Sequence, residues 1–390
     1  MTPPLSAHAL GADLFHGLAE LERTDAGWLP HRLPARARAQ CTDPQLASAE
    51  AQPSGVRLAF RTRSTTIELD LVRTRMSLSG VPDRPDGTVD VTVDGRLAGQ
   101  ATTTGGNVIH VDMTSGQTEV QRGTPGTLRF GGLPDHDKDV ELWLPFHERT
   151  EIVALRTDAS ITPMQAGERP VWLHHGSSIS QGSNAASPTA TWPAAAAALG
   201  GVDLVNLGLA GSAMLDPFTA RTMRDTPADV ISVKIGINIV NADVMRVRAF
   251  GPAVHGFLDT IRDGHPSAPL LVIGPLHCPI HETTPGPGAF DPTALAEGKV
   301  RFVATGDPAS VNRGSLTLTV IREQLTALMA ARTAEDPHLH YLDGHDLYGP
   351  ADVTEHPLPD NLHPDAATHL LIADRFARTA FSVGGPFARR

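Results

Sequence analysis

The spacing of apolar residues changes along this 390-residue chain, and this change constrains the fold more than any other feature. From about residue 56 to 155, apolar and polar residues alternate in short runs, such as IELDL at 67–71 and VDVTV at 89–93. The second run ends at Asp94-Gly95, a pair that favours hairpin turns because glycine tolerates positive φ. Many short strands and no long helix predict a β-sandwich of the jelly-roll type.

After a stretch with proline and glycine at residues 161–170, apolar strands alternate with helical segments. This order predicts a parallel, doubly wound sheet whose active site lies at the carboxyl ends of the strands. The predicted strands are 171–173, 202–205, 230–233, 270–273 and 340–342, and the predicted helices are 192–199, 217–223, 244–262, 316–332 and 366–379. The length also favours two domains. We therefore expect an α/β protein with a β-sandwich domain over 1–165 and a second domain over 166–390.

The charge and composition exclude some partners. The formal net charge is -11 and no basic cluster stands out, so we expect no binding to nucleic acid. No run of about 18 apolar residues occurs, so we expect no membrane partner. The first residues, MTPPLSAHALGADLF, lack the basic and apolar regions of a secretory signal, and we expect a cytoplasmic protein.

Four short segments carry groups suited to acyl transfer. Ser178 lies in the segment GSSISQG, between glycines and directly after a predicted strand. A serine in such a turn can project its hydroxyl into a cleft and act as a nucleophile. Backbone N–H groups near Gly211 and the side-chain amide of Asn238 can stabilise an oxyanion. Asp360 lies three residues before His363, a spacing at which a carboxylate can fix the imidazole tautomer. Each segment alone is common in turns and caps, but their joint occurrence in this order favours an enzyme.

These segments, over about residues 170–382, resemble the blocks of the SGNH (GDSL-type) hydrolase family. The resemblance implies a flavodoxin-like catalytic domain with Ser178 as nucleophile and His363 and Asp360 as its catalytic partners. It also implies an oxyanion hole formed by Ser178, Gly211 and Asn238. Two positions depart from the family pattern, because Ser177 and Ile239 stand where the family commonly has aspartate. Neither position takes a direct part in acyl transfer.

The N-terminal half resembles the β-sandwich of a two-domain SGNH subset that contains carbohydrate esterases and an acyltransferase. The resemblance rests on residues 11–15 (GADLF) and 144–147 (LPFH). It implies an acyl-serine intermediate and an O-acyltransferase that moves an aromatic acyl group from acyl-coenzyme A to a sugar hydroxyl of a natural product. An esterase of carbohydrates or small esters, with the same mechanism, is the alternative. The implied partners are a small-molecule acyl donor and a sugar-bearing acceptor, which the β-sandwich would help to bind, with acyl-coenzyme A as co-substrate and no cofactor or metal.

Two other classes of function compete with this interpretation. The pair His277 and His281 could ligate a metal, although Pro279 argues against a helix presenting both. A carbohydrate-binding protein with an inactive catalytic domain would also have a β-sandwich, but aromatic residues are only 5% of the chain, and we expect Trp143 to pack in the core.

Two further expectations concern the surface. Arginines recur along the predicted strands, and we expect Arg57, Arg61, Arg73 and Arg75 to lie on solvated strand faces. The segment 279–313 is long, polar and rich in glycine and proline, and we expect a loop that covers the site.

Overall fold

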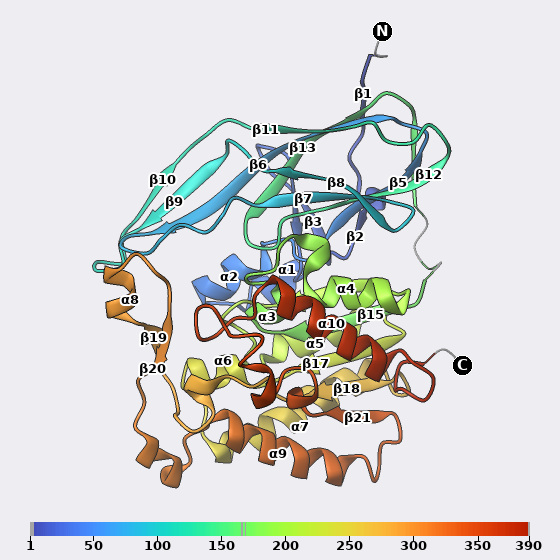
Figure 1. Ribbon diagram of the computed structural model, residues 1–390. Coiled ribbons are helices and arrows are strands. Elements are labelled where there is room, and N and C mark those ends of the chain that lie inside the picture. Colours follow the sequence, from blue (N-terminus) through green and yellow to red (C-terminus); the bar gives the residue numbers. More distant parts are fainter. Residues whose placement is uncertain (1–3, 165–166, 168, 389–390) are drawn as a thin grey trace. The chain divides into compact units, whose positions relative to one another are not determined.

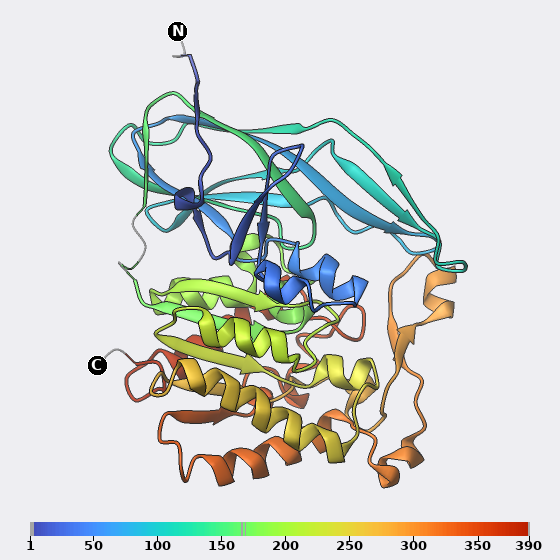
Figure 2. The ribbon, with the colours of Figure 1, turned by 180° about the vertical axis from the view of Figure 1, so that it is seen from behind.

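The computed structural model describes residues 4–164, 167 and 169–388, and the chain forms two compact units. The first unit comprises Met1–Ala35, Ala47–Glu168 and Ser187–Thr189, and the second comprises Arg36–Leu46, Arg169–Ala186 and Ala190–Arg390. Residues 165 and 166, between which we expect the domain boundary, lie outside the described residues. Figure 1 and its reverse view in Figure 2 show the elements of each unit.

The N-terminal unit is β-rich and contains two sheets. One has the strand order β10-β9-β6-β13-β4-β3, with β1 on β13 and β11 on β6, and the other has the order β14-β5-β12-β7-β8, with β2 on β5. All pairs are antiparallel except β6 with β9. The strands are β1 (Ser6–His8), β2 (Phe15–His16), β3 (Glu20–Arg23), β4 (Trp28–His31), β5 (Arg57–Thr62), β6 (Thr66–Leu78), β7 (Thr88–Val93), β8 (Arg96–Thr102), β9 (Asn107–Val111), β10 (Thr118–Gln121), β11 (Gly126–Gly131), β12 (Lys138–Trp143), β13 (Arg149–Thr157) and β14 (Ile161–Pro163). The helices in this part of the sequence are η1 (Ala12–Leu14), α1 (Ala35–Arg38) and α2 (Pro44–Glu50).

The two sheets share one apolar core. Alternate residues of β6 and β11, such as Leu69 and Leu128, pack with residues of β5, β7 and β12, such as Phe60, Val91 and Leu142. The period of two in the sequence therefore places one face of each strand in the core, as expected for a sandwich. Whether these two sheets form a jelly roll stays a prediction.

The arginines predicted on solvated strand faces are partly buried, so that prediction is wrong for Arg57 and Arg73. Arg57 is 1% exposed, donates to Glu141 Oε1 at 3.1 Å and lies over the Trp143 ring. Trp143 is buried, as expected. The alternation cannot reveal such burial, because the partner that compensates each charge comes from a distant strand.

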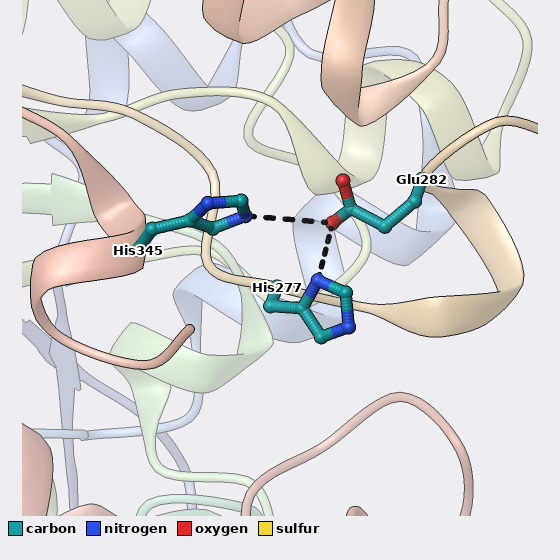
Figure 3. Close-up of side chains that lie close together, drawn as sticks. All are labelled: His277, Glu282 and His345. Atoms are coloured by element: carbon teal, nitrogen blue, oxygen red, sulfur yellow. Dashed lines mark ion pairs between the residues drawn. The ribbon is translucent and has the colours of Figure 1, made fainter. Parts of the chain in front are cut away.

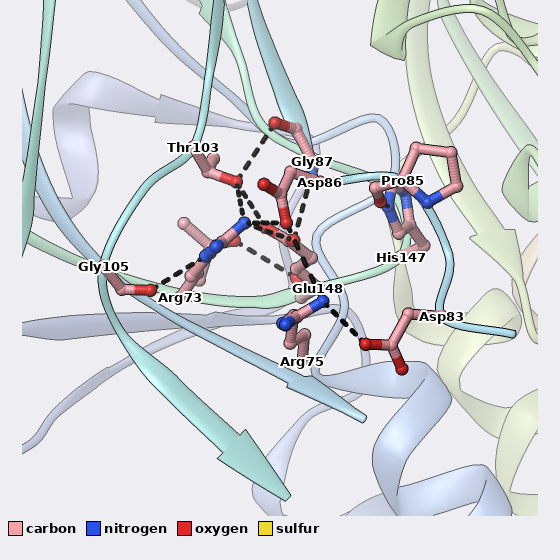
Figure 4. A network of polar contacts seen from close by, with 11 residues as sticks. Arg73, Arg75, Asp83, Pro85, Asp86, Gly87, Thr103, Gly105, His147 and Glu148 are labelled. Carbon is pink, nitrogen blue, oxygen red and sulfur yellow. Dashed lines mark hydrogen bonds and ion pairs between the residues drawn. The ribbon is translucent and has the colours of Figure 1, made fainter. Parts of the chain in front are cut away.

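Arg73 lies at the centre of a buried polar network (Figure 4). It donates to Thr103 Oγ1 at 3.1 Å and pairs with Glu148 Oε1 at 3.2 Å. Glu148 is 1% exposed and also accepts from the Gly87 N–H at 2.9 Å. The Asp86 carboxylate lies 2.7 Å from the Arg73 guanidinium, so both buried charges are compensated.

The second unit contains a five-stranded parallel sheet of order β16-β15-β17-β18-β21. Numbered along this sheet, the order is 2-1-3-4-5, which is that of flavodoxin-type doubly wound sheets. The strands are β15 (Val171–Gly176), β16 (Asp203–Gly208), β17 (Val230–Lys234), β18 (Leu270–Ile273) and β21 (Leu339–Leu342). The helices in this part of the sequence are α3 (Ser178–Gln181), η2 (Pro188–Ala190), α4 (Trp192–Gly200), α5 (Pro217–Asp225), α6 (Ile237–Asn241), α7 (Val247–Gly264), α9 (Leu318–Arg332), η5 (Gly344–Asp346), η6 (Pro350–Asp352) and α10 (Ala366–Ala380). Every strand and helix predicted for this half is present, with ends that differ by a few residues.

The central strand β15 shows how helices cover both faces of this sheet. Trp172 stacks on Phe376 of α10 and contacts Trp192 of α4. His175, which points to the opposite face, stacks on Phe257 of α7. Successive side chains of a strand alternate between faces, so each face of β15 packs against its own helices.

The segment 279–313 is more ordered than the loop we expected. It contains η3 (Pro279–His281), a hairpin of β19 (Gly288–Phe290) and β20 (Phe302–Ala304), α8 (Pro292–Ala296) and η4 (Pro308–Arg313). Glycine and proline residues lie at the ends of these short elements. They interrupt the alternation of apolar and polar residues, so the sequence pattern does not reveal that the two strands pair. Within the residues that the structure describes, no helix has the length and apolar character needed to cross a bilayer.

Candidate active site

Ser178 lies at the sharp turn between β15 and α3. Ser177 caps the helix, and its Oγ accepts the Ile179 N–H at 3.4 Å. Gly176 is required at the strand end, because a Cβ there would clash with the Ser180 hydroxyl. The serine that replaces the usual family aspartate at 177 therefore has a local role, as a helix cap.

His363 and Asp360 meet Ser178 in a row of short contacts. His363 Nε2 lies 2.9 Å from Ser178 Oγ, and His363 Nδ1 lies 2.8 Å from Asp360 Oδ2. All three side chains are buried. Asp360 Oδ1 accepts the backbone N–H groups of His363 at 2.7 Å and Leu362 at 3.0 Å. The carboxylate is thus held by its own loop while it faces the imidazole.

The charge state of Asp360 sets the tautomer of His363. Burial raises the pKa of Asp360, but the hydrogen bonds and charge of His363 and the two backbone N–H groups outweigh it, and the net pKa is lowered. An ionised carboxylate can only accept, so Nδ1 carries the proton. Nε2 is then free to accept the Ser178 hydroxyl proton, as a general base requires.

The loop after β16 carries Gly211, whose φ of 73° is in the region that favours glycine. Gln181 of α3 accepts the N–H of the preceding Ala210 at 2.9 Å, and Gln45 donates to the Ala210 carbonyl at 3.0 Å. These contacts hold the Gly211 loop against the helix that begins at Ser178.

Asn238 lies in the first turn of α6, whose N-cap residue is Gly236. Its Oδ1 accepts the Ala213 N–H at 3.1 Å, which links α6 to the Gly211 loop. The oxygen of the amide is therefore engaged, and the Nδ2 group is the side that can donate. In the described part of the chain, neither this Nδ2 nor the N–H of Ser178 or Gly211 donates a hydrogen bond to the protein.

Three residues that sequence reasoning missed support the loop of residues 360–363, which carries Asp360 and His363. Phe302 of β20 donates its N–H to the Asp360 carbonyl at 2.9 Å, accepts from Asn361 Nδ2 at 3.2 Å and places its ring edge-on to His363. Asn184 donates to Asp360 Oδ2 at 3.3 Å, and the Cys278 thiol donates to the Asn361 carbonyl at 3.4 Å. These residues are far from the loop in the sequence, and none stands in a recognisable motif.

A small hollow is lined by sequence neighbours of the site residues, among them Ile179, Ile237 and Leu362. Lys234 also lines it, and burial lowers the pKa of this ammonium to about 8. Burial likewise raises the pKa of the Cys278 thiol to about 12, so this cysteine is a protonated hydrogen-bond donor and not a thiolate nucleophile.

The histidine pair considered as metal ligands is not brought together. The His281 ring contacts Asn241 Oδ1 and the Thr284 carbonyl, both at 3.2 Å. Among the described residues, the structure instead gathers His277 with Glu282 and His345 (Figure 3).

The matches to known families and structures place this chain in the GDSL-type class of acyltransferases and esterases. Residues 168–280 match the GDSL-like Lipase/Acylhydrolase family. Residues 14–152 match the family described as SsfX3, N-terminal domain. The chain therefore combines a GDSL-like domain with an SsfX3-type N-terminal domain.

Several solved structures are similar to this chain over most of its length. The Salicylyl-Acyltransferase SsfX3 from a tetracycline biosynthetic pathway is 28% identical, with a TM-score of 0.74 over 93% of this chain and 92% of that one. A protein from Bacteroides ovatus described as a GDSL-like lipase is 19% identical, with a TM-score of 0.63 over 94% and 92%. A family two carbohydrate esterase from Clostridium thermocellum is 13% identical, with a TM-score of 0.53 over 83% and 91%. No curated protein matched the chain.

Proposed function

We propose that the chain catalyses acyl transfer through an acyl-serine at Ser178. The row of contacts from Ser178 through His363 to Asp360 carries this proposal, since it pairs a hydroxyl with an oriented base. The same row favours catalysis over a carbohydrate-binding protein with an inactive domain.

In the proposed mechanism, His363 Nε2 takes the hydroxyl proton while Ser178 Oγ attacks the acyl carbonyl. Asp360 stabilises the imidazolium that forms. The N–H groups of Ser178 and Gly211 and the side-chain amide of Asn238 donate to the oxyanion. When the tetrahedral intermediate collapses, His363 returns the proton to the leaving group, and the acyl group stays on Ser178. A hydroxyl of the acceptor then attacks the acyl-serine while His363 takes its proton. The bond from Ser178 Oγ to the acyl carbon breaks, His363 returns the proton to Oγ, and the new ester is released.

We propose an aromatic acyl-coenzyme A as donor and a sugar hydroxyl of a natural product as acceptor. Support comes from the similarity to a salicylyl acyltransferase over nearly the whole of both chains. A cytoplasmic location would supply the thioester donor. The N-terminal unit is the proposed acceptor-binding part of the chain.

The esterase alternative uses the same acyl-serine but water as the acceptor. The carbohydrate esterases of similar fold keep this alternative open. Product analysis separates the two. If only free acid forms at every concentration of glycosylated acceptor, the enzyme is an esterase.

Mass spectrometry of the intact protein tests the nucleophile. The wild-type chain is incubated with a panel of aromatic and aliphatic acyl-coenzyme A thioesters, and we expect a mass increment equal to one acyl group. Ser178→Ala should abolish it. The neighbouring Ser177→Ala is the matched control, because it removes only a helix cap, worth about 0.5–2 kcal/mol, and should still be acylated. An increment that persists in Ser178→Ala contradicts the proposal.

A further inference from the structure

We propose that His277, Glu282 and His345 form a structural binding site for one divalent transition-metal ion of the zinc type. His277 and Glu282 flank η3 in the segment after β18, and His345 belongs to η5 after β21. Figure 3 shows the two imidazoles facing the same carboxylate from different segments. Two imidazole nitrogens and one carboxylate oxygen are a frequent ligand set for zinc.

The distances between the three ligand atoms suit such an ion. His277 Nδ1 lies 3.2 Å and His345 Nε2 lies 3.9 Å from Glu282 Oε1, and all three atoms lie within 4.8 Å of one another. Zinc bonds of about 2.0–2.2 Å in a tetrahedron separate ligand atoms by roughly 3.3–3.5 Å. Small side-chain rotations therefore suffice to place all three atoms around one ion, with a water as the fourth ligand.

The two imidazole nitrogens lack hydrogen-bond partners. His277 Nδ1 and His345 Nε2 are both buried, and neither makes a hydrogen bond of acceptable geometry within the part of the chain that the structure describes. Buried polar atoms are nearly always paired, because leaving one unpaired costs free energy. Both atoms point toward the same oxygen, so one bound ion would satisfy both.

The carboxylate is oriented by residues around it. Arg322 Nη1 donates to Glu282 Oε2 at 3.2 Å, and the Thr319 hydroxyl donates to the same oxygen at 3.3 Å. Arg322 Nη2 also donates to Oε1, at 3.3 Å, so the guanidinium binds both oxygens and fixes the carboxylate with Oε1 facing the two imidazoles, as outer-shell partners of metal ligands commonly do. Arg322 also faces Asp343 at 3.3 Å, so two carboxylates surround one guanidinium and the local charge is negative.

The ion would join two loops that lie next to the proposed catalytic loop. Cys278, between the two ligands of the first segment, donates its N–H to Glu282 Oε1 at 3.1 Å and its thiol to the Asn361 carbonyl. Asn361 lies between Asp360 and His363. The ion would therefore stabilise the residues that hold this loop, without contacting the reacting atoms. The metal-site proposal does not rest on the proposed function.

Metal binding and stability test the site in the full-length chain after treatment with a chelator. We expect Zn²⁺ to bind with one ion per chain and to raise the melting temperature by a few degrees, since an ion that binds only the folded state stabilises it. Co²⁺ should give the visible absorption of a tetrahedral site. His277→Ala and His345→Ala should lose both effects. His338→Ala, at a half-buried histidine outside the cluster, is the control and should keep them.

The metal-free variants are compared with the metal-free wild type by circular dichroism. This comparison distinguishes a loss of metal binding from a loss of folding. If His277→Ala does not fold, His345→Gln decides, because that side chain is 30% exposed and its replacement is mild. The proposal is wrong if the wild type binds no stoichiometric Zn²⁺, or if the cluster variants bind as tightly as His338→Ala. In that case the cluster is an ion-pair network around Arg322.

Discussion

The two polar atoms of the Asn238 side-chain amide have different roles. The contact of Oδ1 is structural, and the proposed role in the oxyanion hole belongs to Nδ2. Its Oδ1 accepts the Ala213 N–H, while Nδ2 is the donor side. Aspartate has the same shape and keeps the acceptor for Ala213 but has no N–H to donate. We therefore expect Asn238→Asp to lower kcat by at least about 10²–10³, because one oxyanion donor is lost and the new carboxylate also repels the oxyanion.

Steady-state kinetics with the donor found by mass spectrometry, beside the melting temperature of each variant, check this prediction. KM should change little, because the oxyanion forms only after binding. Wild-type kcat in Asn238→Asp would exclude Asn238 from the oxyanion hole.

Asp360 makes stability depend on pH in the acidic range. Its pKa is lowered in the folded chain, so the folded state binds this proton more weakly than the unfolded chain does. The carboxylate therefore stabilises the fold fully above about pH 5, and this contribution is lost as the pH falls through the folded-state pKa, below the ordinary value of about 3.9. Asp360→Asn cannot titrate.

Urea unfolding of wild type and Asp360→Asn from about pH 6 to pH 2 measures this contribution. The stability advantage of the wild type should shrink as the pH falls. An exposed carboxylate exchange, Asp374→Asn, serves as the control and should show a much smaller change. A constant difference between wild type and Asp360→Asn would mean that the fold does not depend on this ionisation.

At the scale of elements, Phe302 connects the β19–β20 hairpin to the loop of residues 360–363, the proposed catalytic loop. Its backbone N–H and carbonyl bind Asp360 and Asn361, and its ring lies 5.6 Å from the His363 ring. Phe302→Ala keeps the backbone bonds and removes only the ring. One aromatic contact is worth about 0.5–1.5 kcal/mol, so we expect kcat to fall by up to about tenfold.

The rate of acylation of Ser178, followed by rapid mixing and mass spectrometry, measures this effect. Phe290→Ala is the matched control, since Phe290 contacts the Phe302 ring from the opposite strand of the hairpin. Phe302→Pro removes the N–H that binds the Asp360 carbonyl and should lower acylation further. Equal rates in all three variants would show that the hairpin does not position the loop.

At the scale of the whole molecule, each unit has its own core, and the N-terminal unit also contains buried charges. Glu148 and Arg73 are 1% and 7% exposed and pair with each other. Removing one partner of a buried ion pair leaves an uncompensated charge and costs about 3–5 kcal/mol. We therefore expect Arg73→Met, which leaves the buried Glu148 carboxylate without its guanidinium partner, to lower the free energy of unfolding by about this amount; in Glu148→Gln the Asp86 carboxylate still pairs with Arg73, and the loss should be smaller.

Denaturant unfolding of a double-mutant cycle checks the origin of the loss. Arg73→Met combined with Glu148→Gln should be more stable than Arg73→Met alone, because the unpaired carboxylate is then gone. Additive losses in the double variant would mean that the two side chains do not act as a pair.

The sequence by itself determined the two kinds of fold, the strands and helices of the second half, and the segments of the proposed site. This is possible because the spacing of apolar residues records which face of each element is buried, and because the site residues follow strand ends. Gly176 and Gly211 also stand where the backbone requires glycine.

Only the tertiary structure decided which distant residues meet. Ser178 and His363 are 185 positions apart, and their 2.9 Å contact depends on the packing of α3 and of the loop before α10. The burial of Arg57 and Arg73, the contact of Phe302 with His363, and the gathering of His277, Glu282 and His345 arise in the same way. Each is a contact between segments that are far apart in the chain, and local spacing carries no information about such pairs.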